Sequence, residues 1–203
     1  MKQFYIVTHP QATHHVDRLV GGWYDSELTA KGMENARACG RRLLELDLQG
    51  VPIFSSDLTR TRQTAQAIAD CLGSEARYDA QLREMSFGSA EGLSQDEIGG
   101  PILSSDGANR LDFRNAHGGE TKRELAIRLY QVMNEVILGE RAVICTHGYA
   151  ATFLIACWIG MPIESVGYVN FRVLPGSITC LVQDDIHTNR AVRYLSDTRH
   201  LDC

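Results

Sequence analysis

Two histidines stand directly after apolar stretches that read as buried strands. His9 follows Phe4-Tyr5-Ile6-Val7-Thr8, and His147 follows Ala142-Val143-Ile144-Cys145-Thr146. Aromatic and β-branched residues favour strands, and Pro10, which lacks a backbone N–H, ends the first one. If the strands are parallel neighbours, both imidazoles stand at the carboxyl edge of the sheet, where open α/β sheets bind ligands. Taken alone, His9 is better explained as a residue that merely ends a strand.

An arginine and a glutamate add the other groups that phosphoryl transfer needs. Arg60 lies where a short strand passes into a helix, so its guanidinium and the helix N-terminus are expected near the same edge. Arg62 is two residues further on and faces another side of a helix. Glu84 follows in a loop. An imidazole attacks phosphorus, cations hold its oxygens, and a carboxylic acid protonates the leaving oxygen and then activates water. None of these steps requires a metal.

Strand-like and helix-like segments alternate along the chain. Helices are predicted from the N-cap Thr29 to about Leu46, from near Asp57 to Gly73, from Thr121 onward, and over Tyr149–Ile159. Further strands are predicted at Gly50–Ser55, Ser177–Gln183 and Arg190–Leu195. The alternation predicts an α/β protein, a single domain over residues 1–203, with a mostly parallel central sheet between helices, in three α/β/α layers.

Two connecting segments are predicted to lack regular structure. Residues 11–18 read as a polar loop. Residues 94–117, rich in glycine and serine, read as a lid-like insertion that would shape the substrate pocket. The sequence of this insertion does not name a substrate.

Composition narrows the class of protein. The chain has 203 residues and a net charge of -5, which argues against a general affinity for nucleic acid or an anionic membrane. The apolar run Ala150–Met161 is too short to span a bilayer. The 6 cysteines are scattered without a CxxC pair, and the chain opens without a signal-peptide pattern, so a cytoplasmic protein with reduced thiols is predicted. The oligomeric state stays open between monomer and homodimer.

No metal or cofactor site is predicted. His14 and His15 are adjacent, so their side chains are expected to point apart, and no further ligand follows at a metal-binding spacing. The glycine pairs do not follow a strand in the GxGxxG pattern of a dinucleotide site.

Short motifs at compatible spacing identify a family. They are Thr8-His9-Pro10, Gly22-Trp23-Tyr24-Asp25 with Leu28-Thr29 and Gly32, Ser55–Ala65 around Arg60, Leu82–Gly92 around Glu84, Gly119-Glu120-Thr121, and Thr146-His147-Gly148. Each motif is weak alone, but in this order they cover nearly the whole chain. The chain resembles the histidine phosphatase superfamily, also called the phosphoglycerate mutase-like fold.

This resemblance implies a metal-independent phosphatase of the compact branch, acting on a small phosphorylated substrate. It makes His9 the nucleophile that becomes phosphohistidine, with Arg60 and His147 binding the phosphoryl group and Glu84 as the acid/base. It also selects Arg60 over Arg62. Mutases of the superfamily usually carry a longer C-terminal region, so a phosphoglycerate-type mutase is the less favoured alternative.

The chain departs from the family signature on both sides of His9. Thr8 replaces an arginine and Pro10 replaces a glycine. A lost charge-assisted contact is worth roughly 1.5–3 kcal/mol, or on the order of ten- to a hundredfold in rate. Thr8 itself, His15 (where the family often has a phosphate-contacting asparagine), and Arg18 are therefore predicted to bind substrate, with His14 as a further candidate. The other alternative is a member that binds a phosphorylated ligand without turnover.

Overall fold

The computed structural model describes residues 1–98, 110–115 and 117–201. Its strands form a six-stranded sheet in the order β3-β2-β4-β1-β5-β6. The strands are β1 (Lys2–Thr8), β2 (Ile53–Ser55), β3 (Ala76–Tyr78), β4 (Arg141–Thr146), β5 (Ile178–Gln183) and β6 (Arg190–Asp197). Strands β3, β2, β4 and β1 pair in parallel, whereas β5 runs antiparallel to β1 and β6. The predicted mostly parallel sheet is confirmed.

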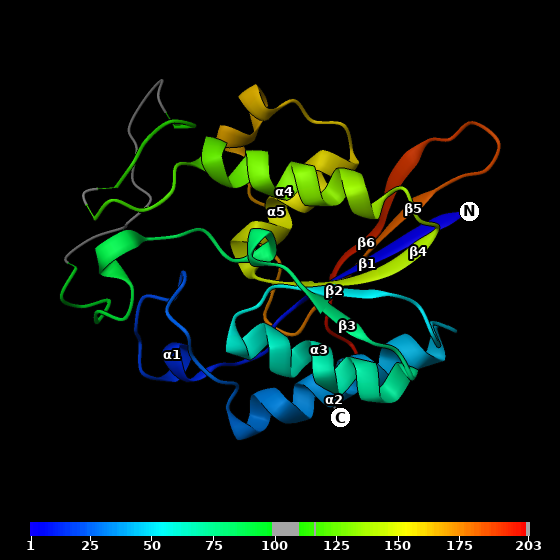
Figure 1. Ribbon diagram of the computed structural model, residues 1–203, viewed down its shortest axis with the longest axis horizontal. Helices are drawn as coiled ribbons and strands as arrows, with labels where there is room; N and C mark the ends of the chain where they lie inside the picture. Colours follow the sequence, from blue (N-terminus) through cyan, green and yellow to red (C-terminus); the bar gives the residue numbers. More distant parts are fainter. Residues whose placement is uncertain (99–109, 116, 202–203) are drawn as a thin grey trace.

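Helices cover both faces of this sheet. The α-helices are α1 (Thr13–Val16), α2 (Ala30–Glu45), α3 (Thr59–Leu72), α4 (Lys122–Val136) and α5 (Gly148–Trp158), and the 3-10 helices are η1 (Ala80–Leu82), η2 (Gly88–Ala90) and η3 (Ile163–Tyr168). Helices α2 and α3 lie on one face of the sheet, and α4 and α5 lie on the other (Figure 1). This arrangement confirms the three predicted layers.

Alternate residues of β1 enter two separate cores, because successive side chains of a strand point to opposite faces. Phe4 and Ile6 pack into the core under α4 and α5, whereas Tyr5 and Val7 pack into the core under α2 and α3. The neighbouring strand β4 alternates in the same way. The strand that leads to each histidine is therefore buried on both faces, which explains its continuous apolar sequence.

The predicted helix ends are confirmed. Thr29 caps α2 by accepting a hydrogen bond from the Gly32 N–H at 3.0 Å. Thr121 caps α4 in a capping box with Glu124. Gly73 ends α3 with a φ of 62°, in the left-handed region that a residue with a side chain rarely adopts.

The structure differs from the sequence predictions in two segments, at α1 and at β3. Residues 11–18 are not a plain loop, because Thr13–Val16 form one turn of helix. The short edge strand β3 carries no long apolar run and was not predicted. Much of the predicted insertion at residues 94–117 lies outside the described residues. Among the described residues, no helix has both the length and the apolar character needed to cross a membrane.

Candidate active site

The sheet brings His9 and His147 to one edge. Strands β1 and β4 are parallel neighbours with Thr8 paired to Thr146, so the next residue of each strand leaves the sheet at the same level. The two ring centroids lie 5.1 Å apart in an edge-to-face arrangement. His9 is 6% exposed and His147 is fully buried. The predicted placement of the two histidines beside each other is therefore found in the structure.

Hydrogen bonds fix which nitrogen of His9 carries its proton. Nδ1 lies 2.9 Å from the Pro10 carbonyl oxygen, which only accepts, so Nδ1 carries the hydrogen. Nε2 then holds a lone pair, and it accepts a hydrogen bond from Arg60 Nε at 3.2 Å. Burial, and after it the charge of Arg60, holds the pKa of His9 well below its ordinary value. The free protein thus presents a neutral imidazole whose Nε2 lone pair faces the Arg60 guanidinium.

Arg60 is held almost without exposure, at 1%, in the first turn of α3. Its terminal nitrogens donate to the carbonyl oxygens of Tyr24 and Gly22, each at 2.7 Å. Burial lowers the pKa of Arg60 to about 10, which still leaves it charged at neutral pH. Arg62 instead stacks its guanidinium 4.0 Å over the Tyr78 ring. The structure therefore brings Arg60, and not Arg62, to His9.

Glu84 lies against the start of α5. Its carboxylate accepts hydrogen bonds from the backbone N–H groups of Met85, Tyr149 and Ala150, each at 2.9 Å. The residue is half-buried, but its carboxyl group is enclosed, and this burial raises the pKa of Glu84. The three N–H donors and Arg60 oppose the effect without cancelling it. A carboxyl that keeps its proton to higher pH suits a general acid.

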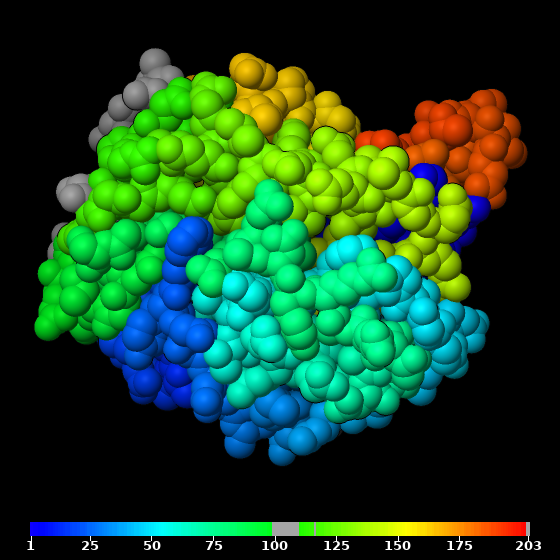
Figure 2. Space-filling model, viewed as in Figure 1, coloured from blue at the N-terminus to red at the C-terminus, as the bar shows by residue number. Residues whose placement is uncertain are grey.

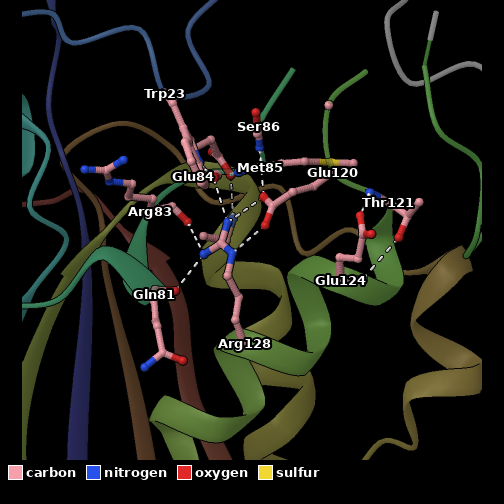
Figure 3. A network of polar contacts seen from close by, with 12 residues as sticks. Trp23, Gln81, Arg83, Glu84, Met85, Ser86, Glu120, Thr121, Glu124 and Arg128 are labelled. Carbon is pink, nitrogen blue, oxygen red and sulfur yellow. Dashed lines mark hydrogen bonds and ion pairs between the residues drawn. The ribbon is translucent and has the colours of Figure 1, made fainter. Parts of the chain in front are cut away.

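The loop that carries Glu84 is fastened to α4 by Arg128 (Figure 3). Arg128 Nη1 donates to the carbonyl oxygens of Gln81 and Arg83 at 2.6 and 2.8 Å, and Nη2 donates to that of Glu84 at 2.7 Å. Nε and Nη2 also bind both carboxylate oxygens of Glu120, at 2.7 and 2.8 Å. Every N–H of the guanidinium is thus used. The backbone on both sides of Glu84 is held in one place.

His14 and His15 stand beside His9. The His15 ring stacks on the His9 ring at 5.5 Å with an angle of 12°, and the His14 ring lies 4.0 Å from that of His15. The expectation that adjacent histidines point apart is wrong here, because the two rings contact each other and both lie beside the ring of His9. His14 Nδ1 contacts the Ser26 hydroxyl at 2.6 Å. Burial lowers the pKa of His14 to about 3.

Among the described residues, no group of three or more histidine, cysteine, aspartate or glutamate side chains is placed to hold a metal ion.

Two of the predicted substrate contacts are placed differently. Thr8 borders the cavity, but its hydroxyl donates to the Leu174 carbonyl oxygen at 2.5 Å, so that hydrogen is not offered to a ligand. Along β1, Thr8 follows Phe4 and Ile6 toward the face opposite Tyr5 and Val7, which explains this direction. Arg18 does not line the cavity.

Arg18 is tied to another part of the chain. Its guanidinium pairs with Asp96 at 2.9 Å, and its side chain is 65% exposed. Sequence reasoning did not anticipate this pairing, because Asp96 lies in the insertion. The substrate-binding role predicted for Arg18 is therefore not supported by its position.

A cavity of about 240 Å³ opens onto these side chains, and His9, Arg60, Glu84, His14 and His15 all line it. His147 is not among the residues that line the cavity. Its Nε2 lies 2.9 Å from the Ser56 hydroxyl.

Sequence reasoning did not single out Ser56 or Arg128. Ser56 sits in the motif around Arg60, so that motif carried a signal for it. Arg128 lies within the apolar periodicity of α4, and no local pattern marks it.

Comparison with known sequences matches most of this chain. The family model of the histidine phosphatase superfamily (branch 1) matches residues 4–195. The probable phosphoglycerate mutase GpmB of Salmonella choleraesuis is 34% identical over 170 residues, which is 80% of this chain and 77% of that protein.

Solved structures show the same fold. A mycobacterial glucosyl-3-phosphoglycerate phosphatase superposes with a TM-score of 0.79 and 24% identity, covering 98% of this chain and 100% of that one. The alpha-ribazole phosphatase of Shigella flexneri gives a TM-score of 0.77 and 24% identity, covering 96% of each chain.

Proposed function

Because this chain belongs to the histidine phosphatase superfamily (branch 1), we propose that it is a metal-independent phosphatase that hydrolyses a small phosphomonoester through a phosphohistidine on His9. The single observation that carries the proposal is the hydrogen bonding of His9. The Pro10 carbonyl holds the proton on Nδ1, which leaves the Nε2 lone pair beside the Arg60 guanidinium.

In the first step the Nε2 lone pair of His9 forms a bond to phosphorus, and the bond between phosphorus and the leaving oxygen breaks. Glu84 gives its proton to that oxygen. Arg60 and His15 line the cavity and are proposed to contact the phosphoryl oxygens, so the charge that accumulates there meets donors already in position. His147, whose ring lies 5.1 Å from that of His9, is proposed to join them once the substrate is bound. The product alcohol then leaves.

In the second step the Glu84 carboxylate takes a proton from water as the water oxygen bonds to phosphorus. The bond between His9 Nε2 and phosphorus breaks, inorganic phosphate leaves, and the lone pair returns to Nε2. Glu84 is again protonated. All protons and electron pairs are supplied by the substrate, water and these two side chains.

Two observations favour alternative functions, so the experiment must distinguish these from the phosphatase. The name of the Salmonella relative favours a phosphoglycerate-type mutase. The Thr8 hydroxyl is hydrogen-bonded to the Leu174 carbonyl and replaces a charged arginine with no cation, which favours a member that binds a phosphorylated ligand with little turnover. The proposal covers a cytoplasmic enzyme, as a monomer or a homodimer, and the free thiols of Cys39, Cys71, Cys145, Cys157 and Cys180 support that compartment.

A phosphatase screen tests the proposal. The wild-type protein and the His9→Ala variant are assayed with a panel of phosphorylated metabolites in the presence of a chelator. His187→Ala, at an exposed histidine of the β5–β6 turn, is the matched control. We expect phosphate release and an acid-labile phosphoenzyme in the wild type and the control, and neither in His9→Ala. Binding without release supports the non-catalytic alternative, and transfer to a second hydroxyl instead of water supports the mutase.

A further inference from the structure

The cavity at His9 has an apolar wall that the reaction steps above do not use. Leu19, Phe87, Val173 and Pro175 line it. They come from three separate segments, after α1, before η2 and before β5. Leu19, Phe87 and Val173 are half-buried and Pro175 is exposed, so this wall keeps apolar surface in reach of a ligand. At about 240 Å³, the cavity is smaller than the roughly 300–1,000 Å³ typical of pockets for larger ligands.

Positive charge is concentrated at the phosphoryl end. Among the described residues that line the cavity, Arg60 is the only arginine or lysine. Arg18, at the end of α1, is paired with Asp96. Arg172, next to Val173, is exposed and does not line the cavity. Residues 99–109 lie outside the described part, and their sequence contains no lysine, arginine or histidine.

The cavity lining also includes one carboxyl, that of Glu84, which adds no positive charge whether or not it holds its proton. A second anionic group on a substrate would therefore find no second arginine or lysine among the described lining residues. Besides the histidines, Thr8 and Gln95, the lining side chains offer it only the Glu84 carboxyl and apolar surface. An anion removed from water without a partner is strongly disfavoured, whereas an apolar group against the same wall gains stability.

We propose that the alcohol released from the phosphomonoester is small, uncharged and partly apolar, and that esters with a second anionic group, such as phosphoglycerates, are poor substrates. This inference rests on the proposed phosphatase function. The side chains at His9 then recognise the phosphoryl group, and the wall of Leu19, Phe87, Val173 and Pro175 selects the rest of the molecule.

A pair of esters matched in size tests the charge. Phosphoglycolate carries a carboxylate, and its amide replaces that group with an uncharged one of nearly the same shape. We expect kcat/KM to be at least about tenfold higher for the amide. A series from ethyl to butyl phosphate tests the apolar wall, and we expect kcat/KM to rise about fourfold for each added methylene until the cavity is filled.

A charge placed on the wall should reverse the preference. Leu19 lines the cavity without joining a core cluster, so Leu19→Lys adds a cation at little cost in packing. We expect this variant to turn over phosphoglycolate and its amide within about threefold of each other. Ile186→Lys is the control, because Ile186 is 83% exposed in the turn between β5 and β6, which stands out from the body of the molecule (Figure 2).

Binding of phosphonates, which cannot be hydrolysed, separates this inference from the proposed function. Calorimetry compares 3-phosphonopropionate with its amide on the wild-type protein. Tighter binding of the amide without turnover of any ester overturns the phosphatase proposal and supports the selectivity. Turnover with equal or better use of phosphoglycolate, or no gain along the alkyl series, overturns the selectivity alone. No binding of either phosphonate and no turnover overturns both.

Discussion

Replacing Arg128 by methionine should destabilise the protein far more than the same substitution at an exposed arginine. The Arg128 side chain is 15% exposed and that of Glu120 is 16% exposed, so the ion pair between them is largely withdrawn from water. Methionine keeps much of the side-chain volume but donates no hydrogen bond. The Glu120 carboxylate and the carbonyl oxygens of Gln81, Arg83 and Glu84 would all lose a donor.

The size of the effect follows from this burial. Removing one partner of a buried ion pair costs about 3–5 kcal/mol, because the other charge stays buried and unpaired. For a chain of this length, each 1 kcal/mol lowers Tm by roughly 2–4 °C. We therefore expect Arg128→Met to lower Tm by about 6–20 °C. Arg128→Lys should recover only part of this loss, since an ammonium group cannot bind three carbonyls and a carboxylate in one plane.

Thermal and urea denaturation measure the effect, with Arg123→Met as the matched control on the same helix. Arg123 also makes a two-bond ion pair, with Asp112, but these side chains are 37% and 46% exposed. Exposed pairs contribute about 0.2–1 kcal/mol. The double variant Arg128→Met with Glu120→Leu should be less destabilised than the sum of the two single variants, because no unpaired charge remains.

A loss below about 1 kcal/mol for Arg128→Met, equal to that of Arg123→Met, would refute this reasoning. It would mean that the loop at Glu84 keeps its place without the guanidinium. Activity gives a second readout on the folded fraction. If Arg128 positions Glu84, the variant should lose more kcat with alkyl phosphates than with aryl phosphates, because only the former depend strongly on the acid.

Three further outcomes are expected. Glu84→Gln should slow alkyl phosphates roughly a hundredfold or more and activated aryl phosphates about tenfold or less; an equal loss on both would assign Glu84 to structure or binding. Thr8→Arg should lower Tm without raising kcat/KM, because position 8 is 2% exposed and its hydroxyl is bound to the Leu174 carbonyl; a gain in activity at unchanged Tm would contradict this placement. Burial holds the pKa values of the four site histidines below their ordinary value, so the unfolded chain binds more protons once the pH falls below about 6.5. In phosphate-free buffer, Tm should therefore stay level above pH 7 and fall from pH 6.5 to 5.5, and the fall should be less steep in His14→Gln. The raised pKa of Glu84 acts in the opposite sense, because the folded state then binds the extra proton. A Tm that does not change over this range would exclude the effect.

The sequence by itself determined the layers and the main elements. Apolar runs that end in a histidine predicted two buried strands, and local signals such as the Thr29 cap and Gly73 predicted where helices begin and end. These signals act within a few residues of each other, so they can be read along the chain. The sequence predicted that His9 and His147 lie close together only if their strands are parallel neighbours, and the structure shows that they are.

The tertiary structure decided how the individual side chains of the site are arranged. The Thr8 hydroxyl meets a carbonyl 166 residues further along the chain, and Arg18 pairs with Asp96, 78 residues away. Arg128 reaches the carbonyl of Gln81, 47 residues before it. Partners this distant leave no local pattern, because the contact exists only after strands and helices pack. The strands determine the position of each Cα atom in the site. Which hydrogen-bond partner a polar side chain meets depends on the other parts of the fold that pack against it.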